Sequence, residues 1–384
     1  MKIVIVSNFV NHHTRDLALE LYARLGEGFA FVQTGSPQAD AYRMGYAHHL
    51  AQPEQYPWAI SAEEKPEEAR KIIFEADAVL TANTPDQWIL PRLRAGKLTF
   101  RVHERWYRRE LPWYRWPRAV LGGWLHHSQF QNLYMLCASA YTASDANSVG
   151  CFRGKCYRWG YFPAFYEYCL DQLRNWKQRP EINILCAGRM VDCKRFEDAV
   201  VACLQLQQVG FPFTLTLAGD GPELEKLQKI ASPLGANVRF LGRITPEQVR
   251  QQMEQSQIFL FTSDRREGWG AVLNEAMNSG CAVVASCAAG ATPCLVEHGV
   301  NGLVYPGGDV PTLTDHLRYL LEHPEARLSM GLRAYETIRD FWTPAIAAQR
   351  LCALCSHLLT GEGSAFADGP CSPAPVLYDK SKTQ

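Results

Sequence analysis

The sequence predicts an α/β protein made of two doubly wound domains, each with a parallel sheet covered by helices. Its 384 residues exceed what one ordinary hydrophobic core holds and suit two domains. Strand-like apolar runs alternate with amphipathic stretches along almost the whole chain, which is typical of parallel sheets. A polar and aromatic stretch at 162–181, bracketed by Pro163 and Pro180, interrupts this alternation and indicates the connection between the domains.

The first domain is expected to begin with a buried strand, because residues 3–7 are all apolar up to Ser7. An amphipathic helix over Thr14–Leu25 follows. Further strand-like runs lie at 29–33, 78–81, 98–102 and 137–142.

The second domain has a clearer alternation. Its predicted strands are Ile182–Ala187, Phe213–Ala218, Val238–Leu241, Ile258–Phe261 and Ala282–Ala285. Its predicted helices are 195–209, a helix from Glu223 onward, Pro246–Glu254, 270–279, 310–322 and 325–340. This order is typical of a nucleotide-binding sheet.

These elements set the expected boundaries. We expect an N-terminal domain over 1–165, a linker over 166–180 and a C-terminal domain over 181–342. A last helix over 343–360, starting at Pro344, is expected to pack back towards the N-terminal domain. The tail over 361–384 is rich in Gly, Ser and Pro and is predicted to be disordered.

Composition excludes several classes of protein. Lys plus Arg and Asp plus Glu are 39 each, so the chain lacks the basic field of a general nucleic-acid binder. The 13 Cys are odd in number and scattered, which does not indicate a disulfide framework. The lone C-x-x-C of Cys352 and Cys355 lies in an apolar helical pattern, so buried thiols are favoured there over a zinc site or a redox motif. The N-terminus does not resemble a signal peptide and no apolar stretch is long enough to span a membrane, so we expect a cytoplasmic location.

Two acidic residues mark a loop and helix after the fourth strand of the second domain. Glu267 lies in the loop and Glu275 about two turns into the helix, at the carboxyl edge of the sheet, where ligands bind in such folds. Carboxylates accept hydrogen bonds from the vicinal hydroxyls of sugars, and Gly268 and Gly270 permit close backbone approach. The alternative is that Glu267 caps the helix and Glu275 is merely solvated.

Cations follow the first strand of the same domain. Gly188 and Arg189 open a tight loop that ends at Lys194. The planar guanidinium of Arg189 and the compact ammonium of Lys194 are together suited to bind a diphosphate. The turn at Gly219 follows the next strand with Pro at the helix start. Surface charges and a purely structural turn are the alternatives, but all these loops converge on one edge of one sheet.

The second half of the chain resembles the family 4 glycosyltransferases. The resemblance covers about residues 182–305. It rests on Gly188-Arg189 with Lys194, Leu217-Ala218-Gly219-Asp220-Gly221-Pro222, Val238-Arg239-Phe240-Leu241-Gly242, and the pair Glu267 and Glu275.

The resemblance implies a GT-B fold, with two Rossmann-like domains facing across a cleft, and retaining transfer of a sugar without an essential metal or other cofactor. By this resemblance Arg189 and Lys194 neutralise the diphosphate of the donor and Glu275 holds its ribose. Glu267 and the backbone of Gly268, Trp269 and Gly270 hold the sugar. The stretch Arg239, Leu241 and Gly242 borders the base, with Gly219 nearby.

Two departures from the family pattern limit what is carried over. The run Ala289–Cys294 lacks the Glu that many members have, and the first loop has no glycine-rich stretch. The sequence agrees with the metal-free expectation, because it contains no D-x-D motif.

The acceptor side is expected in the first domain. Asn11, His12 and His13 follow the first strand and are candidates to bind acceptor or phosphate, with a helix cap and incidental histidines as the alternative. His103 matches a position where family members often place a histidine near the donor sugar, or else is a structural histidine. Arg101 and Arg105 are further acceptor-side candidates.

Residues 101–118 are dense in Arg, Trp and Tyr. Such a segment suits peripheral contact with an anionic bilayer, which would bring the protein to a lipid-linked acceptor. The alternative, slightly favoured, is a domain-interface segment with buried aromatics and snorkelling arginines.

The sequence therefore predicts a glycosyltransferase that moves a hexose-type sugar from a UDP- or GDP-sugar to a saccharide or lipid-linked acceptor in surface polysaccharide or glycoconjugate synthesis. An epimerase of nucleotide-sugars with the same architecture and a non-catalytic binding partner remain alternatives. A dehydrogenase is set aside, because no G-x-G-x-x-G follows the first strand.

Overall fold

The computed structural model describes residues 1–11, 13–35, 56–108, 111–363 and 366–377. The chain divides into two compact units. The N-terminal unit combines Met1–Ala164 with Thr343–Tyr378, and the C-terminal unit begins at Phe165 and continues to Trp342.

The N-terminal unit contains a seven-stranded parallel sheet with the order β3-β2-β1-β4-β5-β6-β7. Its strands are β1 (Ile3–Ser7), β2 (Phe29–Gln33), β3 (Ala59–Ser61), β4 (Ala78–Ala82), β5 (Thr99–His103), β6 (Leu133–Cys137) and β7 (Cys156–Arg158). All five residues of β1 are buried, as the apolar run predicts for a strand between two others.

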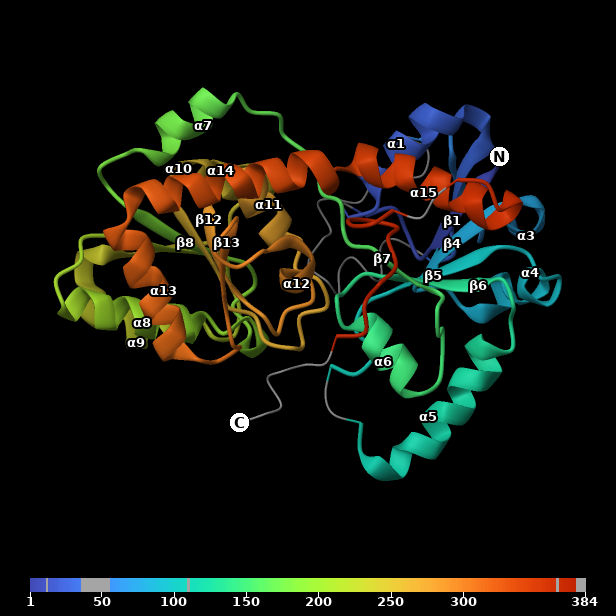
Figure 1. Cartoon of the computed structure of the whole chain (residues 1–384), viewed down its shortest axis with the longest axis horizontal. Helices are drawn as coiled ribbons and strands as arrows, with labels where there is room; N and C mark the ends of the chain where they lie inside the picture. Colours follow the sequence, from blue (N-terminus) through green and yellow to red (C-terminus); the bar gives the residue numbers. More distant parts are fainter. Residues whose placement is uncertain (12, 36–55, 109–110, 364–365, 378–384) are drawn as a thin grey trace. The chain divides into compact units, whose positions relative to one another are not determined.

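Helices cover the sheet of this unit. They are α1 (Arg15–Leu25), α3 (Pro66–Glu75), α4 (Leu90–Arg94), α5 (Trp116–Gly123), α6 (Thr142–Ser148) and α15 (Pro344–Thr360). The last helix, α15, packs against α1, where Arg24 donates a hydrogen bond to the carbonyl of Ala345 at 3.5 Å (Figure 1). The expectation that the C-terminal helix returns to the N-terminal domain is confirmed.

The C-terminal unit contains a six-stranded parallel sheet with the order β10-β9-β8-β11-β12-β13. Its strands are β8 (Asn183–Ala187), β9 (Thr214–Ala218), β10 (Val238–Gly242), β11 (Ile258–Phe261), β12 (Ala282–Ser286) and β13 (Gly302–Tyr305). Its helices are α7 (Leu170–Lys177), α8 (Phe196–Gln208), α9 (Leu224–Ala231), α10 (Pro246–Gln255), α11 (Val272–Asn278), α12 (Thr292–Leu295), α13 (Val310–Glu322) and α14 (Pro324–Phe341).

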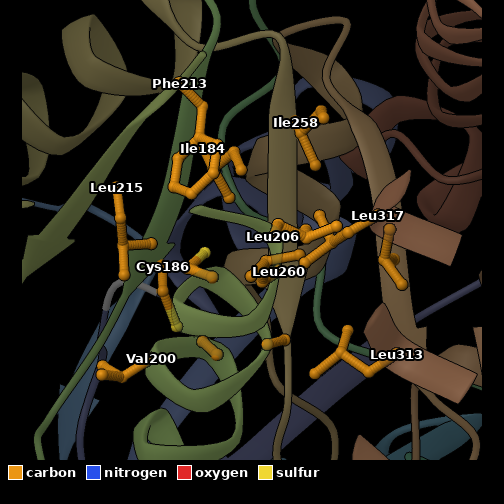
Figure 2. Packing of buried hydrophobic residues seen from close by; sticks show 14 of the residues in the cluster. Ile184, Cys186, Val200, Leu206, Phe213, Leu215, Ile258, Leu260, Leu313 and Leu317 are labelled. Atoms are coloured by element: carbon orange, nitrogen blue, oxygen red, sulfur yellow. The ribbon is translucent and has the colours of Figure 1, made fainter. Parts of the chain in front are cut away.

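The core of this unit lies between the sheet and the helices α8 and α13. Ile184 and Leu260, from neighbouring strands, and Leu206 and Leu317, from the two helices, are all buried in it (Figure 2). The strand order reverses between β8 and β11, which are neighbours in the sheet but not in the sequence. The carboxyl ends of these two strands are therefore the switch point where a doubly wound sheet binds its ligand.

Two expectations about the first unit are wrong. The predicted strand at 137–142 lies too late, because the apolar run Leu133–Cys137 forms β6 and the small residues after it turn the chain into α6. The tail is not disordered throughout, since Cys371 and Ser372 are fully buried against the N-terminal unit. The sequence also did not predict β3, α3 or β13.

Within the described ranges, no helix combines the length and the apolar character needed to cross a bilayer.

Candidate functional site

The loops that follow β8, β9 and β10 are joined by their backbones at the carboxyl edge of the C-terminal sheet. The amide of Gly188 donates to the carbonyl of Ala218 at 2.9 Å, and the amide of Gly219 donates to that of Gly242 at 2.9 Å. These bonds fix the first predicted cationic loop beside the predicted glycine turn. The two sequence motifs therefore form one structural feature.

Gly219 is required by this close approach. Its φ is +138°, and an added Cβ would lie 1.8 Å from the carbonyl oxygen of Gly188. No side chain fits there without moving the backbone of the neighbouring loop. Gly219 therefore shapes the site and offers no side chain to a ligand.

Lys194 and Glu267 form an ion pair at the switch point, between the ammonium Nζ and the carboxylate Oε2. Their side chains are only 20% and 14% exposed. The hydroxyl of Thr262, just after β11, donates to the carbonyl of Lys194 at 2.6 Å. The amide of Asp264 donates to the carbonyl of Cys193 at 2.8 Å. The structure thus brings together two predicted residues from the loops of adjacent strands.

The loop that carries Glu267 is shaped by Gly270 and Trp269. Gly270 has a φ of +93°, and an added Cβ would lie 2.3 Å from the ring of Phe261. The Trp269 side chain is fully buried and donates to the Oδ1 of Asn274 at 2.9 Å. The Trp269 side chain is thus held in the interior and shapes the loop, and Gly268 beside it is also buried.

Glu275 lies on α11, directly after this loop, and is half-buried. Within the described part of the chain its carboxylate has no hydrogen bond and no ion pair. Burial raises the pKa of Glu275, and the positive charge of Arg250 opposes that shift. A partly buried carboxylate without a partner is costly unless a ligand supplies donors.

Arg189 and Arg239 are the exposed cations among the predicted donor residues. Arg189 follows Gly188 directly, and its guanidinium forms no ion pair with any residue that the structure describes. Arg239 lies in the middle of β10, opposite Thr216, and not at the carboxyl end of the strand. Leu241 and Gly242 are the residues of that strand that reach the edge.

Sequence reasoning missed the residues that brace the loop. Arg266 pairs with Asp264, with 2.9 Å between Nε and Oδ2, and with Asp192 at 2.7 Å. The amide of Ala291 donates to the carbonyl of Trp269 at 3.1 Å. Asp192 and Ala291 lie far from their partners in the chain, so no local pattern reveals these two contacts.

A cavity of about 170 Å³ lies beside the cationic loop, between the N-terminal ends of α8 and α9. Asp192, Arg195 and Asp198 are among the residues that line it, and Arg195 is held by Asp198 at 2.7 Å. None of Arg189, Lys194, Glu267 and Glu275 lines this cavity. We place the candidate site at the switch point, because the ion pair and the glycine contacts lie there.

In the N-terminal unit, the first loop mostly serves to start α1. The Oδ1 of Asn11 accepts hydrogen bonds from the amides of His13 and Thr14, at 2.9 and 3.2 Å. Asn11 is therefore engaged as a helix cap. The His13 ring stacks on Tyr161 with 4.6 Å between centroids, and His12 lies outside the described residues.

His103 lies at the carboxyl end of β5 and is exposed. Its Nδ1 is 3.0 Å from the carbonyl oxygen of Glu104. Because a carbonyl only accepts, Nδ1 carries the proton, and Nε2 of the neutral ring is left as an acceptor. Such an acceptor suits a sugar hydroxyl.

The two arginines expected on the acceptor side have structural partners. Arg101 donates to the Oδ1 of Asp86 at 2.8 Å. Arg105 is 5% exposed, pairs with Asp145 at 3.5 Å and lies over the ring of Tyr141. Burial and pairing remove Arg105 from the acceptor-side candidates, and Arg101 is only partly accessible.

The aromatic segment divides into a packed part and an exposed part. Trp106 and Trp116 pack against the core of the N-terminal unit. Trp113 and Trp124, on either side of α5, are 84% and 56% exposed. The prediction of buried aromatics therefore holds for only part of this segment.

Comparison with known proteins was made for the whole chain. Residues 174–337 match the family model of the glycosyl transferases group 1. A GDP-mannose-dependent monoacylated alpha-(1-6)-phosphatidylinositol monomannoside mannosyltransferase of Corynebacterium glutamicum is 29% identical over 174 residues, 44% of this chain and 45% of the relative. The amylovoran biosynthesis glycosyltransferase AmsK of Erwinia amylovora is 30% identical over 195 residues, 49% of this chain and 47% of the relative. The chain thus spans under half the length of these curated relatives.

Solved structures extend the likeness to nearly the whole chain. Anabaena HepE in complex with UDP has a TM-score of 0.68 at 18% identity, covering 93% of this chain and 100% of that one. Sucrose-phosphate synthase from Thermosynechococcus elongatus has a TM-score of 0.65 at 17% identity, covering 94% and 100%. At these identities the likeness establishes the fold, which is the GT-B architecture expected from the sequence.

Proposed function

We propose that this protein, whose residues 174–337 match the family model of the glycosyl transferases group 1, transfers a sugar from a nucleotide-diphosphate donor to a hydroxyl acceptor. The observation that carries the proposal is the ion pair of Lys194 and Glu267 at the switch point of the C-terminal sheet. The pair sets a cation suited to a diphosphate directly against a carboxylate suited to sugar hydroxyls. Arg189 and Glu275, whose charged groups form no ion pair with any residue that the structure describes, extend the set.

The donor is proposed to exchange partners with this ion pair. A diphosphate offers Lys194 more negative charge than one carboxylate does, so the ammonium moves to the phosphate oxygens together with Arg189. Glu267 is then released to accept hydrogen bonds from the donor sugar. Binding of the diphosphate thereby prepares the contact to the sugar.

Catalysis in this proposal rests on stabilising the leaving diphosphate. Preorganised charges aimed at a developing anion are usually the largest catalytic contribution, and one such donor is worth about 3 kcal/mol. Arg189 and Lys194 supply this charge without a metal. Attack by the acceptor on the face that the diphosphate leaves would retain the anomeric configuration, with the phosphate accepting the acceptor's proton.

The substrates proposed are a UDP- or GDP-hexose and a saccharide or lipid-linked acceptor. UDP is bound in the HepE structure, and the mannosyltransferase relative is named as GDP-mannose-dependent. That relative is named for a lipid acceptor, and the amylovoran transferase for a role in biosynthesis of amylovoran. His103, through Nε2, is proposed to accept a hydrogen bond from a donor sugar hydroxyl.

A thermal-shift panel of UDP-, GDP- and ADP-sugars tests the donor, followed by release of nucleoside diphosphate in the presence of EDTA. We expect one base to stabilise the protein and turnover to persist without metal. Lys194→Ala and Glu275→Ala should each lower kcat/KM at least about tenfold, or ~1.4 kcal/mol. Lys226→Ala is the matched control, because that exposed lysine pairs with Glu197 at 2.5 Å outside the site.

Near-normal kinetics in both variants would contradict the site. Isomerised sugar formed from the donor alone, without transfer, would instead identify an epimerase.

We also propose that the protein contacts an anionic membrane surface, through an apolar face at 113–125 that overlaps only the end of the expected segment 101–118. The docking face comprises Trp113, Tyr114, Val120, Leu121, Trp124 and Leu125, which are all exposed and lie at helical spacing on and around α5. Arg115 and Arg118 are exposed beside it, and residues 111–130 contain no Asp or Glu. Exposed Trp with flanking Arg is the composition that binds the interface of anionic bilayers.

Flotation with phosphatidylcholine vesicles, with and without phosphatidylglycerol, tests this contact. We expect binding only to the anionic vesicles and weakening with salt. The double variant Leu121→Asp/Trp124→Asp should lose binding, whereas Val209→Asp, at an exposed valine of the other unit, should keep it. Absence of binding at low salt, or self-association that the double variant abolishes, would overturn the proposal.

A further inference from the structure

Residues 371–374 form a short antiparallel addition to the open edge of the N-terminal sheet. The strand β7 is the last in the sheet order, so its outer side lacks a neighbour among the named strands. The amide of Cys371 donates to the carbonyl of Arg158 at 2.8 Å, and the amide of Arg158 donates to the carbonyl of Ser372 at 2.7 Å. The amide of Ala374 donates to Cys156 at 2.9 Å. The segment thus satisfies the backbone groups that an edge strand leaves open.

Side chains of this segment fit the edge closely. Cys371 and Ser372 are fully buried, and Ala374 packs against the hydrophobic cluster of the N-terminal unit. Pro373, which has no amide to donate, lies opposite Tyr157 and points to solvent. The small residues Cys371 and Ser372 thus occupy the buried positions of the segment. Pro373, which has no backbone amide, occupies an exposed position where no amide hydrogen bond is needed.

The segment is fastened beyond the edge as well. Asp368 forms an ion pair with the side chain of Arg158. Arg350 of α15 lies over the ring of Phe366 at 4.7 Å and donates to the carbonyl of Pro370 at 3.4 Å. The same short segment therefore contacts both β7 and α15.

We propose that the outer edge of β7 is a binding site for an extended peptide strand. In the single chain its occupant is residues 366–377, and the edge takes the same segment from a second copy of this chain when its own is removed. The edge recognises the strand by backbone hydrogen bonds. Its specificity comes from the ion pair between Asp368 and Arg158 and from the small, buried side chains of Cys371 and Ser372. Adding a strand to a sheet edge is a general mode of peptide binding, and exchange of an identical element is a low-cost route to dimers.

Removing the segment and supplying it in trans tests the site. A chain that ends at Gly363 should melt at a lower temperature than the full chain, and in light scattering it should associate with added full-length chain, whose segment it takes. A synthetic peptide of residues 366–377 should bind the truncated chain and displace that partner. A peptide N-methylated at Cys371 and Ala374 should bind at least about tenfold more weakly, because both ladder amides are blocked, ~1.4 kcal/mol or more. N-methylation at Val376, which lies past the ladder, is the matched control and should leave binding unchanged.

A truncated chain that does not bind the unmodified peptide, or that melts like the full chain, would overturn the proposal. Should the truncated chain be insoluble, substitutions in the full chain decide. Ala374→Pro should speed hydrogen exchange at the amide of Arg158, whereas Val376→Pro should not. Equal protection of that amide in the two variants would equally refute the site.

Discussion

At the scale of single residues, the charges of the candidate site are unevenly compensated. Lys194 and Glu267 neutralise each other, whereas the half-buried carboxylate of Glu275 has no partner among the described residues. Burying an unpaired charge costs stability, and burial accordingly raises the pKa of Glu275. The site therefore carries a stability cost that a bound donor, through its hydroxyls, relieves.

Glu275→Gln tests this cost. Burial raises the folded-state pKa of Glu275 above that of the unfolded chain. Protonation of Glu275 therefore stabilises the folded protein at low pH, and this stabilisation is lost as the pH rises through the folded-state pKa. We expect the variant to be more stable than the natural protein at pH 8 and equally stable in the acid range where Glu275 is protonated. The measurement is the Tm without ligand across pH, where ~1 kcal/mol corresponds to about 2–4 °C for a unit of this size.

Glu225→Gln provides the control, since Glu225 is exposed in the first turn of α9. A variant of Glu275 that is less stable at pH 8 would mean that its carboxylate is paired in the free protein.

Residue types at the site were predictable from the sequence, but their environments were not. Glu267 and Lys194 were placed correctly at one sheet edge because carboxyl ends of parallel strands share that edge. The Trp269 side chain packs against the ring of Trp342, and Arg105 pairs with Asp145, so both environments depend on segments distant in the sequence. Local patterns carry no information about such partners.

At the scale of elements, the candidate site is held by backbone contacts between loops. The strands that lie in long apolar runs, such as β1 and β11, were predicted within a residue or two, because two buried faces demand continuous apolar sequence. The elements missed were those with weak local patterns, such as the short strands β3 and β13. The tail pairs with β7 through its backbone, which composition does not encode.

Gly219→Ala tests the contact between loops. The added Cβ would meet the carbonyl of Gly188 at 1.8 Å, so the loops after β8 and β9 must separate. We expect a loss of about 2 kcal/mol or more in the free energy of unfolding, from strain and lost hydrogen bonds. Urea denaturation followed by fluorescence measures it, and donor binding should weaken in parallel.

Gly210→Ala separates the two causes of that loss. Gly210 also has a positive φ, +87°, but an added Cβ there meets nothing within 4 Å. It should cost only the backbone strain, about 1 kcal/mol. Equal losses in the two variants would remove the contact with Gly188 as the cause.

At the scale of the whole molecule, the two units differ in how the chain builds them. The described part of the C-terminal unit is one continuous segment, Phe165–Trp342, and its core cluster is drawn entirely from that segment. The N-terminal unit needs α15 against α1 and the tail against β7, both supplied from beyond Thr343. The units are therefore expected to differ in whether they fold as fragments.

Expression of residues 165–342 should give a cooperatively melting protein, whereas residues 1–164 alone should not. The fragment 1–164 exposes the face of α1 that α15 covers and the edge of β7, and both are surfaces that aggregate. Circular dichroism during heating, with the full chain as reference, measures the difference. A sharp melt of 1–164 at the temperature of the full chain would refute this expectation.

The split composition of the N-terminal unit also affects how the protein emerges from the ribosome. Domains generally fold as units while synthesis proceeds at roughly 5–20 residues per second. Here the half that is translated first must wait for the last helix and tail before its surfaces are covered, while the half translated second closes on itself earlier. A nascent chain stalled before Thr343 would thus hold one finished half and one unfinished half, and chaperones would be expected to meet the unfinished one.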